Sequence, residues 1–118
     1  MKIRAIAASL IALAIAGCDG SIRCDGNVLD ESGEPIPNAH VWIEYPDSAK
    51  YPIEYWTAAD GNFHLFNLLA PGYYKLPLTV AANGFRPARV DLPTLTGNRV
   101  VVRLVLTSSG NSSTVLLK

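Results

Sequence analysis

The chain has 118 residues, of which 49% are apolar and 17% are charged. A chain of this length forms one domain and has little room for a second. Its ten basic and ten acidic side chains give a formal net charge of zero, so the composition offers no basic surplus for a nucleic-acid partner. The apolar share is ordinary for a folded protein and argues against an intrinsically disordered chain.

The N-terminus has the features of a secretory signal peptide. A short basic start at 1–4 is followed by an uncharged apolar run at 6–16 and then by small residues. This run of about 11 residues is too short to cross a bilayer core, which needs about 20 helical residues. We therefore expect residues 1–17 to be a signal peptide for export.

The end of this segment, Ile15-Ala16-Gly17-Cys18, resembles the bacterial lipobox. In bacterial lipoproteins the signal is cut before the cysteine, so the resemblance implies cleavage between Gly17 and Cys18 and acylation of Cys18. Two or three acyl chains hold a protein on a membrane without a transmembrane helix. The alternative is a plain signal peptide that ends at a cysteine by chance.

The lipobox resemblance implies a location in the cell envelope, with the domain facing the periplasm. Residues 18–21 are then the lipidated N-terminus and linker. Asp19 resembles the signal that retains enterobacterial lipoproteins in the inner membrane. The inner membrane is therefore favoured, and the outer membrane is the alternative.

The rest of the chain alternates apolar and polar residues with a period of two, which predicts β-strands. Clusters of Gly, Pro, Asn and Asp separate the strands, and Asp60-Gly61 predicts a hairpin turn. Pro77 predicts a sheet edge or a bulge, because proline lacks the N–H that a central strand donates. The polar segment 108–118 is predicted to be a flexible tail. The expected strands are 21–29, 38–45, 53–57, 63–66, 73–80, 85–92 and 100–106.

The alternation also predicts which side chains face the core. On the second strand Ala39, Val41 and Ile43 are expected inward and Trp42 outward. Cys24 has no cysteine partner once Cys18 is acylated. Its place on one strand face predicts burial, and a free thiol or an intermolecular disulfide is the alternative.

Seven short strands in about 100 residues predict an all-β fold of two packed sheets. Residues 26–41 resemble the opening motif of the carboxypeptidase regulatory-like domain, G-x-V-x-D-x-x-G-x-P-[LI]-x-x-A-x-V. Three later segments, 57–63, 69–74 and 82–85, are similar to the family elements T-x-x-x-G-x-F, L-x-P-G-x-Y and A-x-G-[YF]. The motif residues are Gly26, Gly33, Pro35, Ala39, Asp60, Gly61, Phe63, Pro71, Gly72, Tyr74 and Gly84.

This resemblance implies a seven-stranded Greek-key β-sandwich of the transthyretin-like or immunoglobulin-like type over residues 22–107. It implies structural roles for the motif residues, with Tyr74 pinning a neighbouring loop. An extra residue after Phe63 leaves open whether Leu68 or Leu69 points inward. In metallocarboxypeptidases this domain accompanies the enzyme and does not carry its zinc site. The resemblance therefore implies no enzyme, metal or cofactor.

The candidate binding residues are aromatic. Trp42 is expected outward, and Trp56, Tyr45 and Tyr55 lie close to it in the sequence. Exposed aromatic rings anchor protein partners or stack on sugars. The alternative is that the loop at 46–52 covers Trp42.

Residues with catalytic or metal-binding chemistry are few. His40 and His64 are expected on outward strand faces, and they lack the spacing of a metal-binding pair. The loop with Asp30, Glu31 and Glu34 is expected to be a solvated turn, with weak calcium binding as the alternative.

The sequence therefore predicts a membrane-anchored lipoprotein whose non-catalytic β-sandwich is a protein-binding or structural module of the cell envelope. The alternative is a carbohydrate-binding module that uses Trp42 and Trp56 as stacking platforms.

Overall fold

The computed structural model describes residues 21–44, 53–68, 75–94 and 97–118. These described residues form eight strands and no helix. The strands are β1 (Ser21–Leu29), β2 (His40–Ile43), β3 (Ile53–Trp56), β4 (Asn62–Leu68), β5 (Lys75–Ala81), β6 (Ala88–Pro93), β7 (Gly97–Arg103) and β8 (Thr114–Leu117). Among them no helix has the length and apolar character needed to cross a membrane.

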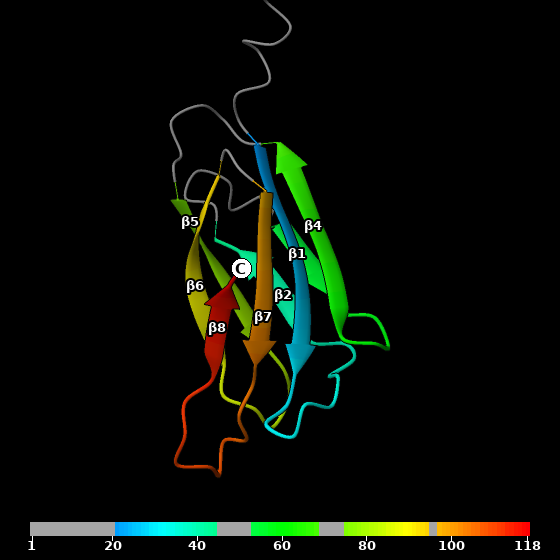
Figure 1. Ribbon diagram of the computed structural model, residues 1–118, viewed down its shortest axis with the longest axis vertical. Coiled ribbons are helices and arrows are strands. Elements are labelled where there is room, and N and C mark those ends of the chain that lie inside the picture. Colours follow the sequence, from blue (N-terminus) through cyan, green and yellow to red (C-terminus); the bar gives the residue numbers. More distant parts are fainter. Residues whose placement is uncertain (1–20, 45–52, 69–74, 95–96) are drawn as a thin grey trace, which may run out of the picture.

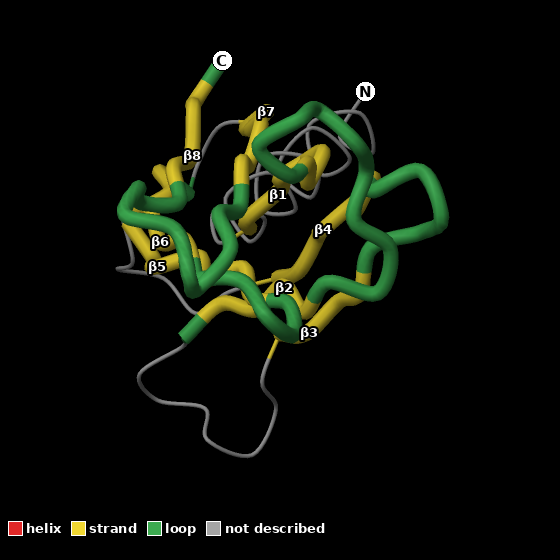
Figure 2. The backbone as a smooth tube through the Cα atoms, turned by 90° about the horizontal axis from the view of Figure 1, so that it is seen from below, coloured by secondary structure: helices red, strands yellow, loops and turns green. Residues whose placement is uncertain are grey.

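The strands form a sandwich of two four-stranded sheets, seen end-on in Figure 2. Sheet A has the strand order β4-β1-β7-β8, and sheet B has the order β3-β2-β5-β6 (Figure 1). In sheet A, β1 pairs antiparallel with β4 and parallel with β7. The pairs of sheet B are all antiparallel. The predicted all-β sandwich is confirmed.

The core lies between the two sheets and is built from alternate residues of each strand. Ala39, Val41 and Ile43 are buried, as their alternation predicts, and so is Cys24. The largest fully buried side chains are Ile22, Ile43, Leu65, Leu76, Leu78, Leu92, Leu104, Val28, Val41, Val80, Val102 and Thr94. Branched aliphatic side chains of both sheets therefore fill the space between the layers.

The turn at Asp60-Gly61 does not close a hairpin, so that prediction is wrong. The strands on either side of the turn belong to different sheets, β3 to sheet B and β4 to sheet A. The Asp60 carboxylate accepts a hydrogen bond from the Asn62 N–H at 3.0 Å, and Gly61 has φ +79°. The chain crosses the sandwich at this turn: Thr57, just after β3, still donates its N–H to the carbonyl of Ala39, just before β2, whereas β4 pairs with β1 in sheet A.

The predicted edge position of Pro77 is also wrong, because β5 lies between β2 and β6. The Pro77 carbonyl accepts a hydrogen bond from the Glu44 N–H, one residue beyond the end of β2. Since the nitrogen and the carbonyl of one strand residue point to the same side, the Pro77 nitrogen points past the last residue of β2. The missing N–H therefore removes no hydrogen bond between named strands.

The eighth strand differs from the predicted flexible tail at 108–118. β8 pairs antiparallel with β7, with Val115 opposite Val102. Val115 packs against the core. The sequence pattern missed this strand because four residues are too few to establish a period of two after the polar run at 108–113.

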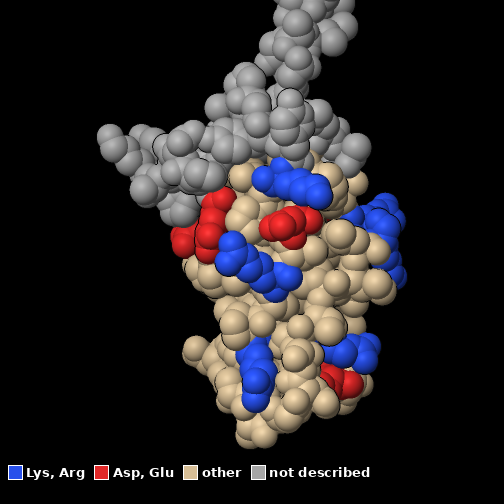
Figure 3. All heavy atoms as spheres, turned by 90° about the vertical axis from the view of Figure 1, so that its left-hand side faces the viewer, with Lys and Arg blue, Asp and Glu red and all other residues tan. Residues whose placement is uncertain are grey.

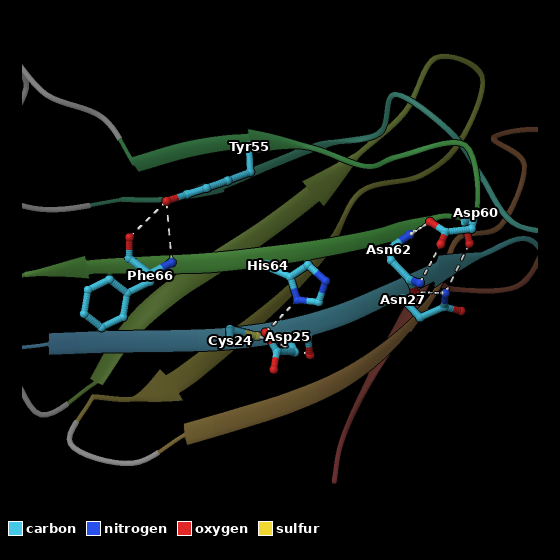
Figure 4. Close-up of polar contacts among 8 residues, drawn as sticks. All are labelled: Cys24, Asp25, Asn27, Tyr55, Asp60, Asn62, His64 and Phe66. Atoms are coloured by element: carbon cyan, nitrogen blue, oxygen red, sulfur yellow. Dashed lines mark hydrogen bonds and ion pairs between the residues drawn. The ribbon is translucent and has the colours of Figure 1, made fainter.

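A tyrosine joins the two sheets at their β3 and β4 edges. Tyr55 on β3 packs against the core and donates its hydroxyl to the Phe66 carbonyl on β4 at 2.9 Å (Figure 4). Removing the hydroxyl with Tyr55→Phe is expected to lower the free energy of unfolding by about 1 kcal/mol, because the edge carbonyl loses its protein donor. Urea unfolding checks this value, and unchanged stability would show that water replaces the hydroxyl at no cost.

Candidate functional site

Three aromatic rings stack on the outer face of sheet B. The His40 ring lies 4.4 Å from the Trp42 ring at an interplanar angle of 27°. It also lies 5.0 Å from the Trp56 ring at 19°. We call these three residues the aromatic platform. The Trp56 side of the platform is open, because that residue is 57% exposed.

The strand register builds this platform. His40 and Trp42 are two residues apart on β2 and so share one face. Trp56 on β3 is the direct cross-strand partner of His40, which brings its ring alongside. Glu54 is paired with Trp42 in the same register, and its carboxylate lies 3.2 Å from His40 Nε2. This contact fixes the orientation of the central ring.

A shallow hollow of about 390 Å³ borders the platform. The residues that line it are Asn38, His40, Trp56, Ala81, Ala82 and Asn83. Asn38 has φ +56°, in the left-handed region that asparagine tolerates better than most residues. The hollow therefore combines an exposed indole with groups that donate and accept hydrogen bonds.

The structure brings together two of the four predicted binding residues. Trp42 and Trp56 belong to the platform, whereas Tyr55 lies on the core side of β3 and is a correction to the predicted set. Tyr45 lies outside the described residues. The sequence analysis missed His40 as the central ring, although its spacing of two from Trp42 places both on one face.

The motif residues of the described segments occupy turns and core positions. Gly33, Gly61 and Gly84 have positive φ, which side chains resist, and this explains the glycines of the motif. Phe63 and Ala39 are buried, and Pro35 forms an isolated bridge with Leu29. The predicted Gly17, Cys18, Pro71, Gly72 and Tyr74 lie outside the described residues, as do Leu69 and the side chain of Leu68.

The acidic loop after β1 is held by its own hydrogen bonds. Asp30 Oδ1 accepts from the Ser32 N–H at 2.8 Å, the Ser32 hydroxyl at 2.7 Å and the Glu34 N–H at 3.0 Å. These bonds, led by the Ser32 hydroxyl, lower the pKa of Asp30. Glu31 Oε2 accepts from the Asn111 amide at 3.2 Å. The carboxylates of Asp30 and Glu31 thus accept hydrogen bonds that hold the loop in place, as expected for a turn.

His40, His64 and Cys24 lie in three different places in the sandwich and do not form a common site. His40 lies on the outer face of sheet B, whereas His64 lies on the outer face of sheet A, 2.9 Å from Asp25 (Figure 4). Cys24 lies in the core between the sheets. Within the described segments, no group of three or more His, Cys, Asp or Glu side chains could hold a metal ion.

Burial makes the Cys24 thiol inert. Desolvation, with a smaller contribution from the charge of Asp25, raises its pKa from 9.0 to about 12. At pH 8 the folded thiol is expected to react with a disulfide reagent about a thousandfold more slowly than the unfolded one, because its thiolate fraction falls by that factor. Thiol kinetics with and without urea measure this ratio, and equal rates would contradict burial.

The same shift has a consequence for stability. Since the folded pKa exceeds the unfolded one, the thiol stabilises the fold fully below pH 9 and loses this contribution as the pH rises toward about 12. Cys24→Val removes this dependence, so the difference between the two proteins isolates it.

Comparisons with known proteins agree with this fold. The family model of the carboxypeptidase regulatory-like domain matches residues 24–107. No curated protein is similar to the chain in sequence. Catechol 1,2-dioxygenase from Pseudomonas arvilla C-1 matches 78% of this chain and 54% of its own, with 12% identity and a TM-score of 0.56.

Another solved structure, 3-chlorocatechol 1,2-dioxygenase from Rhodococcus opacus 1CP, matches 81% of this chain and 60% of its own. Its identity is 10% and its TM-score is 0.51. The chain thus spans little more than half the length of these enzymes, and the likeness concerns the fold alone. The match over residues 24–107 covers most of the sandwich, and the chain belongs to the carboxypeptidase regulatory-like domain family.

Proposed function

We propose that this protein is a lipoprotein of the cell envelope, anchored through acylated Cys18, whose sandwich binds another envelope protein and does not catalyse a reaction. The aromatic platform of Trp42, His40 and Trp56 is the observation that carries the proposed binding role. The lipobox resemblance at 15–18 supports the anchor. Replacing Cys18 with serine is expected to abolish fatty-acid labelling of the protein, and continued labelling would exclude this anchor.

The placement of reactive groups supports a non-catalytic role. The two histidines lie on opposite outer faces, and the thiol is buried with its pKa raised to about 12. A nucleophile needs a base within hydrogen-bond reach, and neither histidine lies beside Cys24 in this arrangement. This arrangement of the described residues supports the proposal that the module acts by binding.

The platform has the composition of a protein-binding hot spot. Tryptophan is enriched among the residues that dominate protein interfaces. Around the rings lie charged side chains, with Glu54 beside His40 and the Glu44–Arg89 ion pair at 3.4 Å farther across the sheet. An apolar centre with a polar rim is the usual anatomy of such an interface.

A photo-crosslinking group at Asn83, which borders the platform, tests the protein partner. In native membranes we expect a crosslink to one protein of defined mass, lost with Trp56→Ala. Leu106→Ala is the matched control, because it removes a large apolar side chain of similar exposure, 50%, from a position outside the aromatic platform. Equal crosslinking in the two variants would reject the platform as the binding surface.

A glycan is the second candidate, and the hollow beside Trp56 is the observation that favours it. An indole face stacks on a sugar ring, while Asn38 and Asn83 offer amides to sugar hydroxyls. Binding to an envelope glycan that is lost with both Trp56→Ala and Asn83→Ala would support this candidate. A glycan panel without binding would exclude it.

A further inference from the structure

The two sheets differ in the charge of their strands. The strands of sheet A together with Lys118 carry four cationic side chains, Arg23, Arg99, Arg103 and Lys118, against the single carboxylate of Asp25. The strands of sheet B carry two of each sign, Lys75 and Arg89 with Glu54 and Asp91. On the side seen in Figure 3, where β5 and β6 lie, both signs are interspersed. The excess of positive charge therefore belongs to sheet A.

These cations share the outer face of their sheet. Arg23 and Asp25 alternate with the buried residues of β1, and Asp25 is paired with Arg99 on β7. Arg23, Arg99 and Lys118 contribute to the lining of a shallow hollow of about 320 Å³. Since Asp25 is the one carboxylate on these strands, its charge offsets only part of the cationic surface.

Exposed apolar side chains flank the cations. Phe66 is 53% exposed beside Arg23, whose guanidinium carbon lies 5.9 Å from the centre of its ring. Leu116 is 61% exposed on β8, next to Val101 on β7. We call the outer surface formed by Arg23, Arg99, Lys118, Phe66 and Leu116 the cationic face. Cations with interspersed apolar groups are the composition of surfaces that lie on anionic membranes.

The short linker places this face near a bilayer. Two residues, Asp19 and Gly20, separate the predicted acylated Cys18 from Ser21, the first residue of β1, and these three steps of the chain span at most about 10 Å. This reach is similar to the Debye length of about 8 Å at physiological salt, so the start of β1 lies within range of lipid charges. The same end of sheet A holds the last residues of β4 and the first of β7 (Figure 1).

We propose that the cationic face of sheet A lies on the anionic phospholipid headgroups of the membrane that holds the anchor. This inference rests on the lipid anchor of the proposed function. Arg23, Arg99 and Lys118 contact headgroup phosphates, and Phe66 and Leu116 enter the interfacial layer. Since the aromatic platform is on the outer face of the other sheet, this orientation points the platform away from the lipid.

Fluorescence quenching on vesicles tests the orientation. The acylated protein is reconstituted into phosphatidylcholine vesicles with or without phosphatidylglycerol, all containing lipids with a quencher near the headgroup. A fluorophore is attached at Leu116→Cys, or at Asp91→Cys on sheet B as the control. Cys24 stays unlabelled because its thiol is buried. We expect phosphatidylglycerol to increase quenching at position 116 and not at position 91.

Charge variants sharpen the test. Each Lys or Arg near an anionic surface contributes about 1 kcal/mol, which is about fivefold in an equilibrium. Arg23→Gln with Arg99→Gln should therefore reduce the ratio of face-bound to detached protein about 25-fold. Arg89→Gln, the single-charge control on sheet B, should change this ratio less than about twofold and less than Arg99→Gln alone.

Flotation of the vesicles separates this proposal from the anchor. Protein that floats with phosphatidylcholine vesicles has its anchor, and equal quenching at positions 116 and 91 would then overturn the cationic face alone. Protein that does not float would overturn the anchor and the orientation that depends on it. Quenching at position 116 that persists in high salt and in the double variant would also overturn the charge-based contact.

Discussion

Gly26→Ala is expected to destabilise the domain by about 3 kcal/mol or more, because overpacking at a rigid core position forces the backbone to shift. Gly26 lies in the middle of β1, opposite Phe63 on β4. An added Cβ would overlap two ring carbons of Phe63 and lie 2.9 Å from Val100 Cγ2. The aromatic ring occupies the space that the glycine leaves, so neither neighbour yields easily.

Gly97→Ala is the matched control for this substitution. It lies in the same sheet on β7, where, among the described residues, an added Cβ meets only Arg23 Cδ at 3.9 Å. We expect a change within about 0.5 kcal/mol for this variant. Urea unfolding followed by circular dichroism measures both, and similar stabilities for the two variants would refute the packing of Phe63 over Gly26.

Thr57→Val is expected to lower the free energy of unfolding by about 3 kcal/mol, although the two side chains have nearly the same shape. Thr57 is 3% exposed. Its hydroxyl accepts from the Ala39 N–H at 2.8 Å and donates to the Ile36 carbonyl at 2.6 Å. Valine leaves both buried backbone groups without this partner, and that desolvation cost accounts for the loss.

The same substitution at Thr79 should not lower the free energy of unfolding. Thr79 is 8% exposed, and its buried hydroxyl has no hydrogen-bond partner among the described residues. Thr79→Val therefore replaces an unsatisfied polar group and should leave stability unchanged or raise it by about 1 kcal/mol. A loss at position 79 as large as that at position 57 would contradict the assigned hydrogen bonds.

The sequence predicted the strands well because alternation is a local property. The first strand, Ser21–Leu29, has the predicted bounds, and the second has the predicted inward set. The pairing of strands depends on residues far apart in the sequence, and a local turn signal predicted one pairing wrongly. Asp60-Gly61 is typical of a hairpin, yet the Thr57 hydroxyl is bonded to Ile36 and Ala39, just before β2, and the next strand, β4, belongs to the other sheet.

The candidate site was predictable in part for the same reason. The outward direction of Trp42 follows from Val41 and Ile43 on either side of it. The stacking of Trp56 on His40 depends on the register between two strands that the loop at 45–52 separates, and no short pattern specifies that register. The prediction that Tyr55 belongs to the binding surface is wrong for this reason. It is next to Trp56 on β3, and neighbouring residues of a strand point to opposite faces, so Tyr55 packs against the core.

The parallel pairing of β1 with β7 delays completion of the fold. The Asn98 side chain donates a hydrogen bond to the Arg23 carbonyl at 3.0 Å, across 75 residues of sequence. A contact of such separation carries a large loop-closure entropy and slows the rate-limiting step of folding. A chain that emerges with its N-terminus first must therefore keep one side of β1 unpaired until β7, Gly97–Arg103, has been made. During synthesis, that open edge exposes unpaired backbone groups to pairing with other chains.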